Sequence, residues 1–204
     1  MIIIKIFAVA IIGYLLGSLN FGVIISKIFY HDDVRKYGSK GSGATNMLRT
    51  YGKLPAAMTF LGDGLKAAAA VLIGVILLGY NGAYIGGAAS VIGHAFPVYY
   101  GFKGGRSVAA AFFMVLCTES LVGLICFAIF LIIVAGTKYV SLGSVIAVLI
   151  YPLILYVITG YGLHNFIAVF IALLIVYLHR GNIKRLLNGS ENKINLKGGK
   201  KEKI

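Results

Sequence analysis

The chain has 204 residues, of which 59% are hydrophobic, and its 19 Lys and Arg outnumber its 6 Asp and Glu to give a net charge of +13. Repeated apolar runs of membrane-spanning length exclude an ordinary soluble domain. Because no soluble basic face with interleaved aromatics is present, the charge indicates anionic lipids and anionic substrates as partners, and no nucleic acid.

Six apolar runs follow one another along the chain, at residues 2–25, 54–79, 81–100, 107–136, 139–159 and 162–178. The first run has one early Lys5 and no small-residue cleavage site, so we interpret it as a retained span rather than a signal peptide. Run 107–136 is ambiguous: as one helix it would extend about 45 Å, beyond a hydrocarbon core of about 30 Å. It is either one tilted span or two short helices that turn at Glu119.

The distribution of positive charge favours the two short helices. Seventeen of the nineteen Lys and Arg lie in loop 26–53, in loop 101–106, at Lys138 and in the tail from residue 179. Splitting run 107–136 places all seventeen on one side of the membrane. We therefore predict an all-α integral membrane protein with about seven transmembrane helices, the N-terminus outside and the C-terminus in the cytoplasm. Residues 1–192 would form one transmembrane domain, and residues 193–204 a basic, disordered cytoplasmic tail.

The first polar cluster, GSKGSGATN at residues 38–46, contains no large apolar side chain. Small residues let backbone N–H groups converge, and the hydroxyls of Ser39, Ser42 and Thr45 add further hydrogen bonds to a phosphate. The GxxxxGK[ST] spacing of a Walker loop is missing. On composition alone, a flexible connector between spans is the alternative.

The second and third clusters also lie on the predicted cytoplasmic side. In GHAFPVYYGFKGGRS, residues 93–107, Lys103 and Arg106 flank two glycines and resemble a second anion-binding corner, with His94 either structural or catalytic. In HRGNIKRLLNGSENK, residues 179–193, His179 and Asn182 share a face if the last span continues as a helix. A basic helix that contacts anionic lipid explains the lysines and arginines of this segment, but not the imidazole and the amide.

Two further pairs of polar residues lie at span ends. Asp63 and Lys66 can pair on a helix, either as a functional intramembrane pair or as a structural ion pair. Ser141 and Ser144 open a span, either as helix caps or as hydroxyls for a phosphate. A lone Asp without other ligands at suitable spacing argues against a metal site, and we expect no metal and no cofactor. The clustered cations, hydroxyls and amides suit a site that binds phosphate and transfers an activated group.

These motifs resemble those of the PlsY family, the acyl-phosphate-dependent glycerol-3-phosphate acyltransferases. The family patterns GSxNFG, GSGNxGATN, GHxFPVFxxFKGGKGVAT and HRxNIxRLLxGxExK match, in order, residues 17–22, 38–46, 93–110 and 179–193. The chain departs from them at Lys40-Gly41, where Gly-Asn is usual, and at Arg106-Ser107, where Lys-Gly is usual.

The resemblance implies a single catalytic domain in the cell membrane, with its site facing the cytoplasm. A fatty acyl group would pass from acyl phosphate to the first hydroxyl of glycerol 3-phosphate, giving lysophosphatidic acid and inorganic phosphate. It assigns the acyl phosphate to Ser39, Gly43 and Thr45, with Ser141 or Ser144. It assigns glycerol 3-phosphate to Arg49, Lys103, His179 and Asn182, and gives His94 and Asn46 the task of shaping the site or supporting the oxyanion.

Three other classes of membrane protein fit the sequence less well than an acyl-phosphate-dependent acyltransferase. None of the four histidines is followed five residues later by Asp, as in acyl-CoA-dependent acyltransferases. An organophosphate transporter would usually show internal repeats with paired broken helices. A CDP-alcohol phosphotransferase would need several carboxylates at the membrane rim for its metal. Within the favoured reaction, the general base is either the phosphate of glycerol 3-phosphate or His179.

Overall fold

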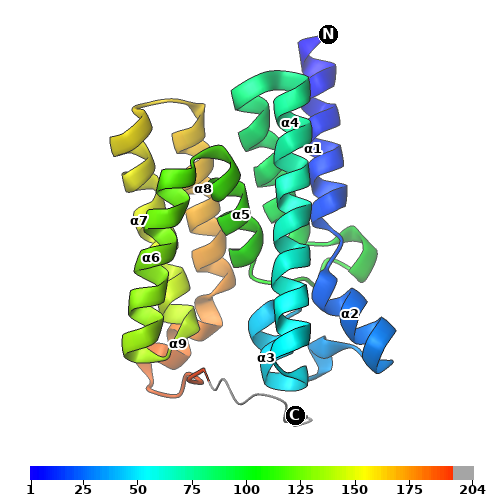
Figure 1. Ribbon diagram of the computed structural model, residues 1–204, viewed down its shortest axis with the longest axis vertical. Helices are drawn as coiled ribbons and strands as arrows, with labels where there is room; N and C mark the ends of the chain where they lie inside the picture. Colours follow the sequence, from blue (N-terminus) through cyan, green and yellow to red (C-terminus); the bar gives the residue numbers. More distant parts are fainter. Residues whose placement is uncertain (195–204) are drawn as a thin grey trace.

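The apolar segments form helices, as Figure 1 shows. A helix satisfies every backbone N–H and C=O within its own segment, which a bilayer requires. The computed structural model describes residues 1–194, and within that range there are helices but no strand. The tail expected at 193–204 lies mostly outside the described residues. The α-helices are α1 Ile2–Gly17, α2 Phe21–Tyr30, α3 Ala44–Tyr51, α4 Lys53–Ala95, α5 Val108–Thr118, α6 Ser120–Thr137, α7 Val140–Thr159, α8 Leu163–Leu178 and α9 Arg180–Leu187, with 3₁₀ turns at Val34–Lys36 and Val98–Tyr100.

Helix α4 is a hairpin with two antiparallel arms. At Gly79 the backbone has φ 65° and ψ −149°, a conformation that glycine adopts far more readily than other residues. The arms pack closely, because a β-carbon added to Gly74 would lie 2.0 Å from the carbonyl oxygen of Gly82. The predicted turn near residue 80, between runs 54–79 and 81–100, is confirmed, although the second arm already ends at Ala95.

The run predicted at 2–25 is two helices and not one. α1 ends at Gly17, and α2 begins at Phe21. Between them the buried amide of Asn20 donates a hydrogen bond to the carbonyl oxygen of His94, and its oxygen accepts one from the Ser42 hydroxyl. These contacts to distant segments hold the corner in a non-helical conformation.

Run 107–136 breaks at Glu119, as the charge distribution predicted. α5 ends at Thr118 and α6 begins at Ser120, with Glu119 between them at φ −140° and ψ 83°. Its carboxylate accepts a 2.7 Å hydrogen bond from the hydroxyl of Tyr80, next to the α4 turn.

Four helical segments of residues 1–194 are long and apolar enough to cross a membrane, or five if the bent pair α8 and α9 counts as one span. This count joins α1 with α2, treats the α4 hairpin as one segment and leaves out the shorter α5. Large apolar side chains cover the outside of the bundle, among them Leu72, Ile132 and Val157, each more than half exposed. A lipid environment accounts for such a surface.

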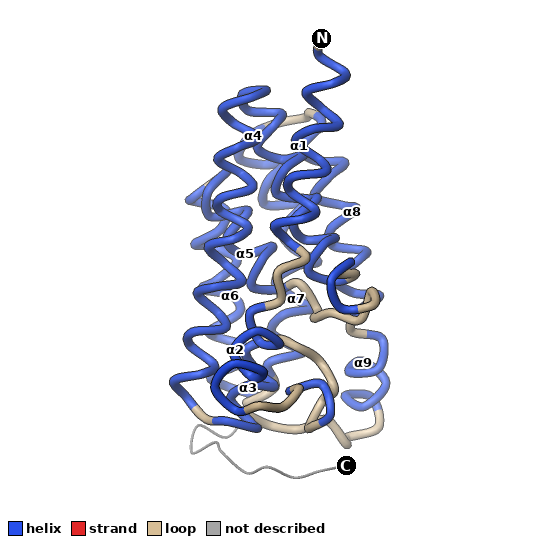
Figure 2. Tube along the Cα trace, turned by 90° about the vertical axis from the view of Figure 1, so that its right-hand side faces the viewer, coloured by secondary structure: helices blue, strands red, loops and turns tan. Residues whose placement is uncertain are grey.

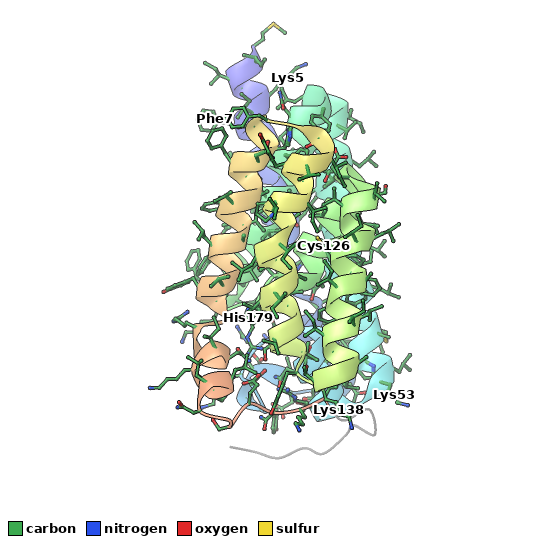
Figure 3. All side chains as sticks on the ribbon, turned by 90° about the vertical axis from the view of Figure 1, so that its left-hand side faces the viewer. Lys5, Phe7, Lys53, Cys126, Lys138 and His179 are labelled. Carbon is green, nitrogen blue, oxygen red and sulfur yellow. The ribbon has the colours of Figure 1, made fainter. Side chains whose placement is uncertain are left out.

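The polar parts of the chain gather at one end of the bundle. Figure 2 shows the short helices α2, α3 and α9, with most of the loops, at the end opposite the N-terminus. In Figure 3, Lys53 and Lys138 lie toward this end, whereas Lys5 lies at the other. The three motif clusters therefore meet at one end of the molecule.

Candidate active site

The loop at residues 38–46 is built around the side chain of Asn46. Its oxygen accepts a 2.9 Å hydrogen bond from the backbone N–H of Ser39. Its nitrogen donates to three carbonyl oxygens, those of Val34, Tyr37 and Gly41. With the amide so occupied, Asn46 shapes the loop that surrounds the site.

Two residues that replace motif glycines have positive φ. Lys40 has φ 56° and Ser107 has φ 62°. The left-handed region favours glycine, because other residues bring their β-carbon close to the backbone there. These φ values give a physical reason for the glycines of the family pattern at both positions.

Helix α3 begins at the wall of a polar cavity. Gly43 is its N-cap in an extended conformation, so the first N–H groups and the positive end of the helix dipole lie where an anion is favoured. Arg49, on the same helix, also lines the pocket. Burial lowers the pKa of Arg49, although the negative charge of Glu191 opposes the decrease. A bound anion would stabilise this partly buried cation.

Arg106 is the second cation that lines this polar cavity. Burial lowers its pKa to about 10; the carboxylate of Glu191 counteracts this, while the positive charges of Arg185 and Arg49 add to it. Arg49, Arg106 and Arg185 therefore lie near one another and near the single carboxylate of Glu191. Such a surplus of positive charge favours binding of a phosphate.

Asp63 and Lys66 form the ion pair that their spacing predicts. Lys66 Nζ lies 2.8 Å from Asp63 Oδ1, and both side chains are almost completely buried. The same nitrogen lies 2.9 Å from Nδ1 of His94, on the other arm of α4. Asp63 and His94 both line the pocket.

The last cluster does not continue as one helix. α8 and α9 meet at 59°, and His179 lies at the bend with its Nδ1 2.8 Å from the carbonyl oxygen of Ile175 (Figure 3). His179 and Asn182 were predicted to share a face only if the last span continued as one straight helix, and the bend shows that it does not. Asn182 instead donates a 2.6 Å hydrogen bond to Glu191.

Glu191 was not among the predicted site residues, although the closing motif contains it. Its carboxylate also accepts hydrogen bonds from Ser141, at 2.8 Å, and from Arg185, at 2.7 Å. Burial alone would raise the pKa of Glu191, but the hydrogen bonds from Asn182, Ser141 and Arg185 outweigh burial and place it below the usual range. Beyond it, Ile194 donates to the carbonyl oxygen of Lys138, so the start of the predicted disordered tail is attached to the domain.

One polar cavity, with about 850 Å³ of empty space when its opening to solvent is included, brings most of the predicted residues together. Among its lining residues are ten of the predicted site residues, namely Ser39, Gly43, Thr45, Asn46, Arg49, His94, Arg106, Ser141, Ser144 and His179. Lys103 does not line it and is exposed. Asn182 reaches it only through Glu191.

A second, apolar cavity of about 680 Å³ adjoins the polar one. Phe60, Val108, Phe130 and Ser144 line both cavities. The apolar cavity lies among α5, α6, α7 and α8, with aromatic side chains such as Phe112 and Phe127 on its wall. The combined space suits a molecule with a charged head and a hydrocarbon chain.

Among residues 1–194, no three His, Cys, Asp or Glu side chains are grouped to hold a metal ion. The polar groups of the cavity are cations, hydroxyls, imidazoles, the Asn46 amide and two hydrogen-bonded carboxylates, those of Asp63 and Glu191. They can bind phosphate and orient a hydroxyl.

Comparison with known proteins identifies the family. The family model for glycerol-3-phosphate acyltransferase matches residues 7–189. This chain belongs to that family. A glycerol-3-phosphate acyltransferase of Clostridioides difficile is 42% identical to it over 201 residues, covering 95% of this chain and 96% of the relative. One of Carboxydothermus hydrogenoformans is 41% identical, covering 91% of this chain and 94% of the relative.

Solved structures support the same assignment of this acyltransferase. The crystal structure of PlsY, an integral membrane glycerol 3-phosphate acyltransferase, in its glycerol 3-phosphate form has a TM-score of 0.88 and 40% identity, and the match covers 93% of this chain and 96% of the other. The lysophosphatidic acid form gives a TM-score of 0.85 with 39% identity, covering 94% and 96%.

Proposed function

We propose that the protein transfers a fatty acyl group from acyl phosphate to the 1-hydroxyl of glycerol 3-phosphate. The products are lysophosphatidic acid and inorganic phosphate, and the reaction is the first step of phospholipid synthesis. The observation that carries the proposal is the junction of a cationic cavity with an apolar one. The similarity to PlsY structures in glycerol 3-phosphate and lysophosphatidic acid forms supports it.

The apolar cavity is proposed to hold the acyl chain. Each buried CH₂ group of a lipid chain contributes about 0.8 kcal/mol. A chain in this cavity would place its activated carbonyl near Ser144, where the two cavities meet. The hydroxyls of Ser39 and Thr45, the α3 N-terminus at Gly43 and the hydroxyl of Ser141 would then bind the donor phosphate.

The cationic wall is proposed to hold glycerol 3-phosphate. Arg49 and Arg106 provide the charge, and His179 and Asn182 orient the glycerol. Holding the hydroxyl in near-attack geometry is the main requirement, because phosphate is a good leaving group. Backbone N–H groups of the 38–46 loop stabilise the negative charge that develops on the carbonyl oxygen.

The reaction needs no covalent enzyme intermediate. The hydroxyl oxygen bonds to the acyl carbon, and the bond from that carbon to the phosphate oxygen breaks. The phosphate of glycerol 3-phosphate, with a second pKa near about 6, is proposed to take the hydroxyl proton. His179 is the alternative base, and a His179→Gln variant that loses more than about a thousandfold in kcat would favour it.

The proposal places the site at the cytoplasmic face of the plasma membrane. Counting both arms of α4, together with α1, α5, α6, α7 and α8, gives seven spans. The N-terminus would then be outside and the basic end of the bundle in the cytoplasm, as positive charge favours.

Phosphate release tests the reaction. Purified protein in lipid nanodiscs receives palmitoyl phosphate and glycerol 3-phosphate in a metal-free buffer, and palmitoyl-CoA replaces the donor in a control. We expect release with the acyl phosphate and none with the thioester. Turnover only with the thioester would contradict the proposed donor.

A matched pair of variants tests the site. Arg106→Ala should lower kcat/KM by about one to two orders of magnitude, because a charge-assisted hydrogen bond to phosphate is lost. Lys103→Ala removes a neighbouring cation that lies outside the cavity, and its loss should be at least fivefold smaller. A larger loss in Lys103→Ala would place glycerol 3-phosphate at the exposed end of the loop instead.

A further inference from the structure

We propose that the buried Asp63–Lys66 pair makes His94 a hydrogen-bond donor to the polar cavity, with Lys66 and Asp63 as positioning residues for acyl transfer. The state of the ring follows from hydrogen-bond geometry alone. Its contribution to turnover rests on the proposed function.

Three acceptors surround the ammonium group of Lys66. They are the carbonyl oxygen of Leu19 at 2.6 Å, Asp63 Oδ1 at 2.8 Å and His94 Nδ1 at 2.9 Å. An ammonium group has three N–H donors and no acceptor. Each donor is therefore matched by one acceptor, and Nδ1 of His94 must contribute its lone pair.

The competing arrangement has weaker geometry. Asp63 Oδ1 lies 3.4 Å from His94 Nδ1, and a hydrogen bond between them would need a proton on Nδ1. At 3.4 Å this contact is 0.5 Å longer than the 2.9 Å contact with Lys66, so the Lys66 hydrogen bond is the stronger of the two. The proton of the neutral ring therefore lies on Nε2.

The Nε2 edge of the ring lies against Gly105, which has no side chain to cover it. A β-carbon at Gly105 would lie 2.1 Å from Nε2. Gly105 directly precedes Arg106, and both Arg106 and His94 line the cavity. In the proposed arrangement, the Nε2–H group reaches the cavity past Gly105, on the side of the chain where Arg106 follows.

The second histidine of the cavity has the opposite arrangement. His179 Nδ1 lies 2.8 Å from the carbonyl oxygen of Ile175, which can only accept, so Nδ1 of His179 carries the proton. Its Nε2 is then an acceptor, suited to a substrate hydroxyl. His94 instead offers a donor, suited to an anionic oxygen of the acyl phosphate or to the oxyanion that forms from its carbonyl.

Lys66 is the residue that determines which nitrogen of His94 carries the proton. Without its ammonium group, Nδ1 of His94 would be protonated and donate to the nearby carboxylate of Asp63. Nε2 would then be an acceptor facing an anion, which is unfavourable. Lys66 thus acts on the reaction through the tautomer of His94.

Nitrogen NMR of the full chain in nanodiscs tests the ring directly. With ¹⁵N-labelled histidine, and His94→Asn to assign the signals, we expect Nε2 of His94 to be protonated and Nδ1 to be an acceptor. In Lys66→Met the proton should move to Nδ1. A wild-type His94 protonated on Nδ1, or on both nitrogens, would overturn the inference whatever the activity.

Kinetics test the positioning role. Lys66→Met should lower kcat by roughly 10²-fold with a much smaller change in KM, as when one oxyanion donor is lost. His94→Gln, whose amide N–H can replace Nε2–H, should retain at least tenfold more turnover than His94→Leu. Lys53→Met, the same substitution at an exposed position of α4, should stay within about a factor of two.

Two outcomes separate this inference from the proposed function. If Lys66→Met moves the proton but keeps the wild-type kcat, the positioning role is excluded. If the wild type itself does not release phosphate from palmitoyl phosphate, the proposed function fails. The NMR result still shows which nitrogen of His94 carries the proton. Should Lys66→Met misfold by thermal melting, Asp63→Leu/Lys66→Met removes both charges. Nδ1 of His94 then has neither partner, so the NMR signals should show a mixture of the two neutral forms of the ring, and kcat should fall as in Lys66→Met; a ring still protonated only on Nε2 would overturn the role of Lys66.

Discussion

Glu191 joins its own segment to two helices through one carboxylate, since Ser141 belongs to α7 and both Asn182 and Arg185 belong to α9. Arg185 is 40% exposed, so the ion pair itself contributes little, and the two buried hydrogen bonds matter more. The carboxylate is stabilised in its ionised form. Its pKa is therefore lower in the folded chain than the ordinary value of 4.5.

The lowered pKa of Glu191 predicts that the free energy of unfolding of the protein depends on pH. A lowered folded pKa means that the unfolded state binds the proton more readily, so the contribution is complete above pH 4.5 and is lost as pH falls through the folded pKa. Glu191→Gln, which resembles the protonated form, should melt below the wild type at neutral pH. The difference should shrink as pH falls toward 3.5, and a difference that stays constant from pH 7 to 3.5 would contradict this account.

The gathering of the predicted residues in one cavity could be anticipated because small, basic and hydroxyl residues are conspicuous in an otherwise apolar sequence. Ten of the twelve predicted residues line one cavity. Lys103 illustrates the limit of this reasoning: composition cannot tell which of two cations in a short loop points inward. Glu191 was not predicted, because a carboxylate is not expected beside a proposed phosphate site unless its hydrogen-bond partners are known.

At the scale of elements, helix packing depends on glycine where α1 meets α4. A β-carbon on Gly17 would lie 2.2 Å from the backbone oxygen of Ser90, so Gly17→Ala must push the two helices apart. We expect a loss of about 1–3 kcal/mol, typical of overpacking. Gly136→Ala in α6 is the matched control, because nothing lies within 4 Å of that position.

Thermal melting in detergent measures both glycine variants. Gly136→Ala should be neutral or slightly stabilising, since alanine favours a helix over glycine by up to about 1 kcal/mol. Equal melting temperatures for Gly17→Ala and the wild type would show that α1 and α4 are not in close contact.

Two interruptions of helices were not predictable from apolar periodicity. The corner at 18–20 depends on the contacts of Asn20 with Ser42 and His94, which are distant in sequence. The bend at His179 likewise departs from a pattern that permits a continuous helix. The break at Glu119 and the turn at Gly79 could be predicted, because the length of a membrane-spanning helix and the distribution of Lys and Arg can both be read from the sequence.

At the scale of the whole molecule, the orientation in the membrane is a prediction that labelling can check. After Cys117 and Cys126 are replaced by Ala, single cysteines at Tyr161→Cys and Lys138→Cys report on opposite ends. A membrane-impermeant maleimide applied to intact cells should label position 161, in the exposed α7–α8 turn, and not position 138. The reverse pattern would put the cavity on the outer face.

In the proposed reaction, the two adjoining cavities receive their substrates from different phases. One substrate dissolves in water and its supply depends on bulk concentration, whereas the other diffuses laterally in the leaflet and its supply depends on mole fraction among the surrounding lipids. Adding inert phospholipid to mixed micelles would therefore slow catalysis at constant total donor, without changing saturation by the water-soluble partner. The proposed reaction would therefore run at a rate set by the fraction of activated acyl chains among the membrane lipids.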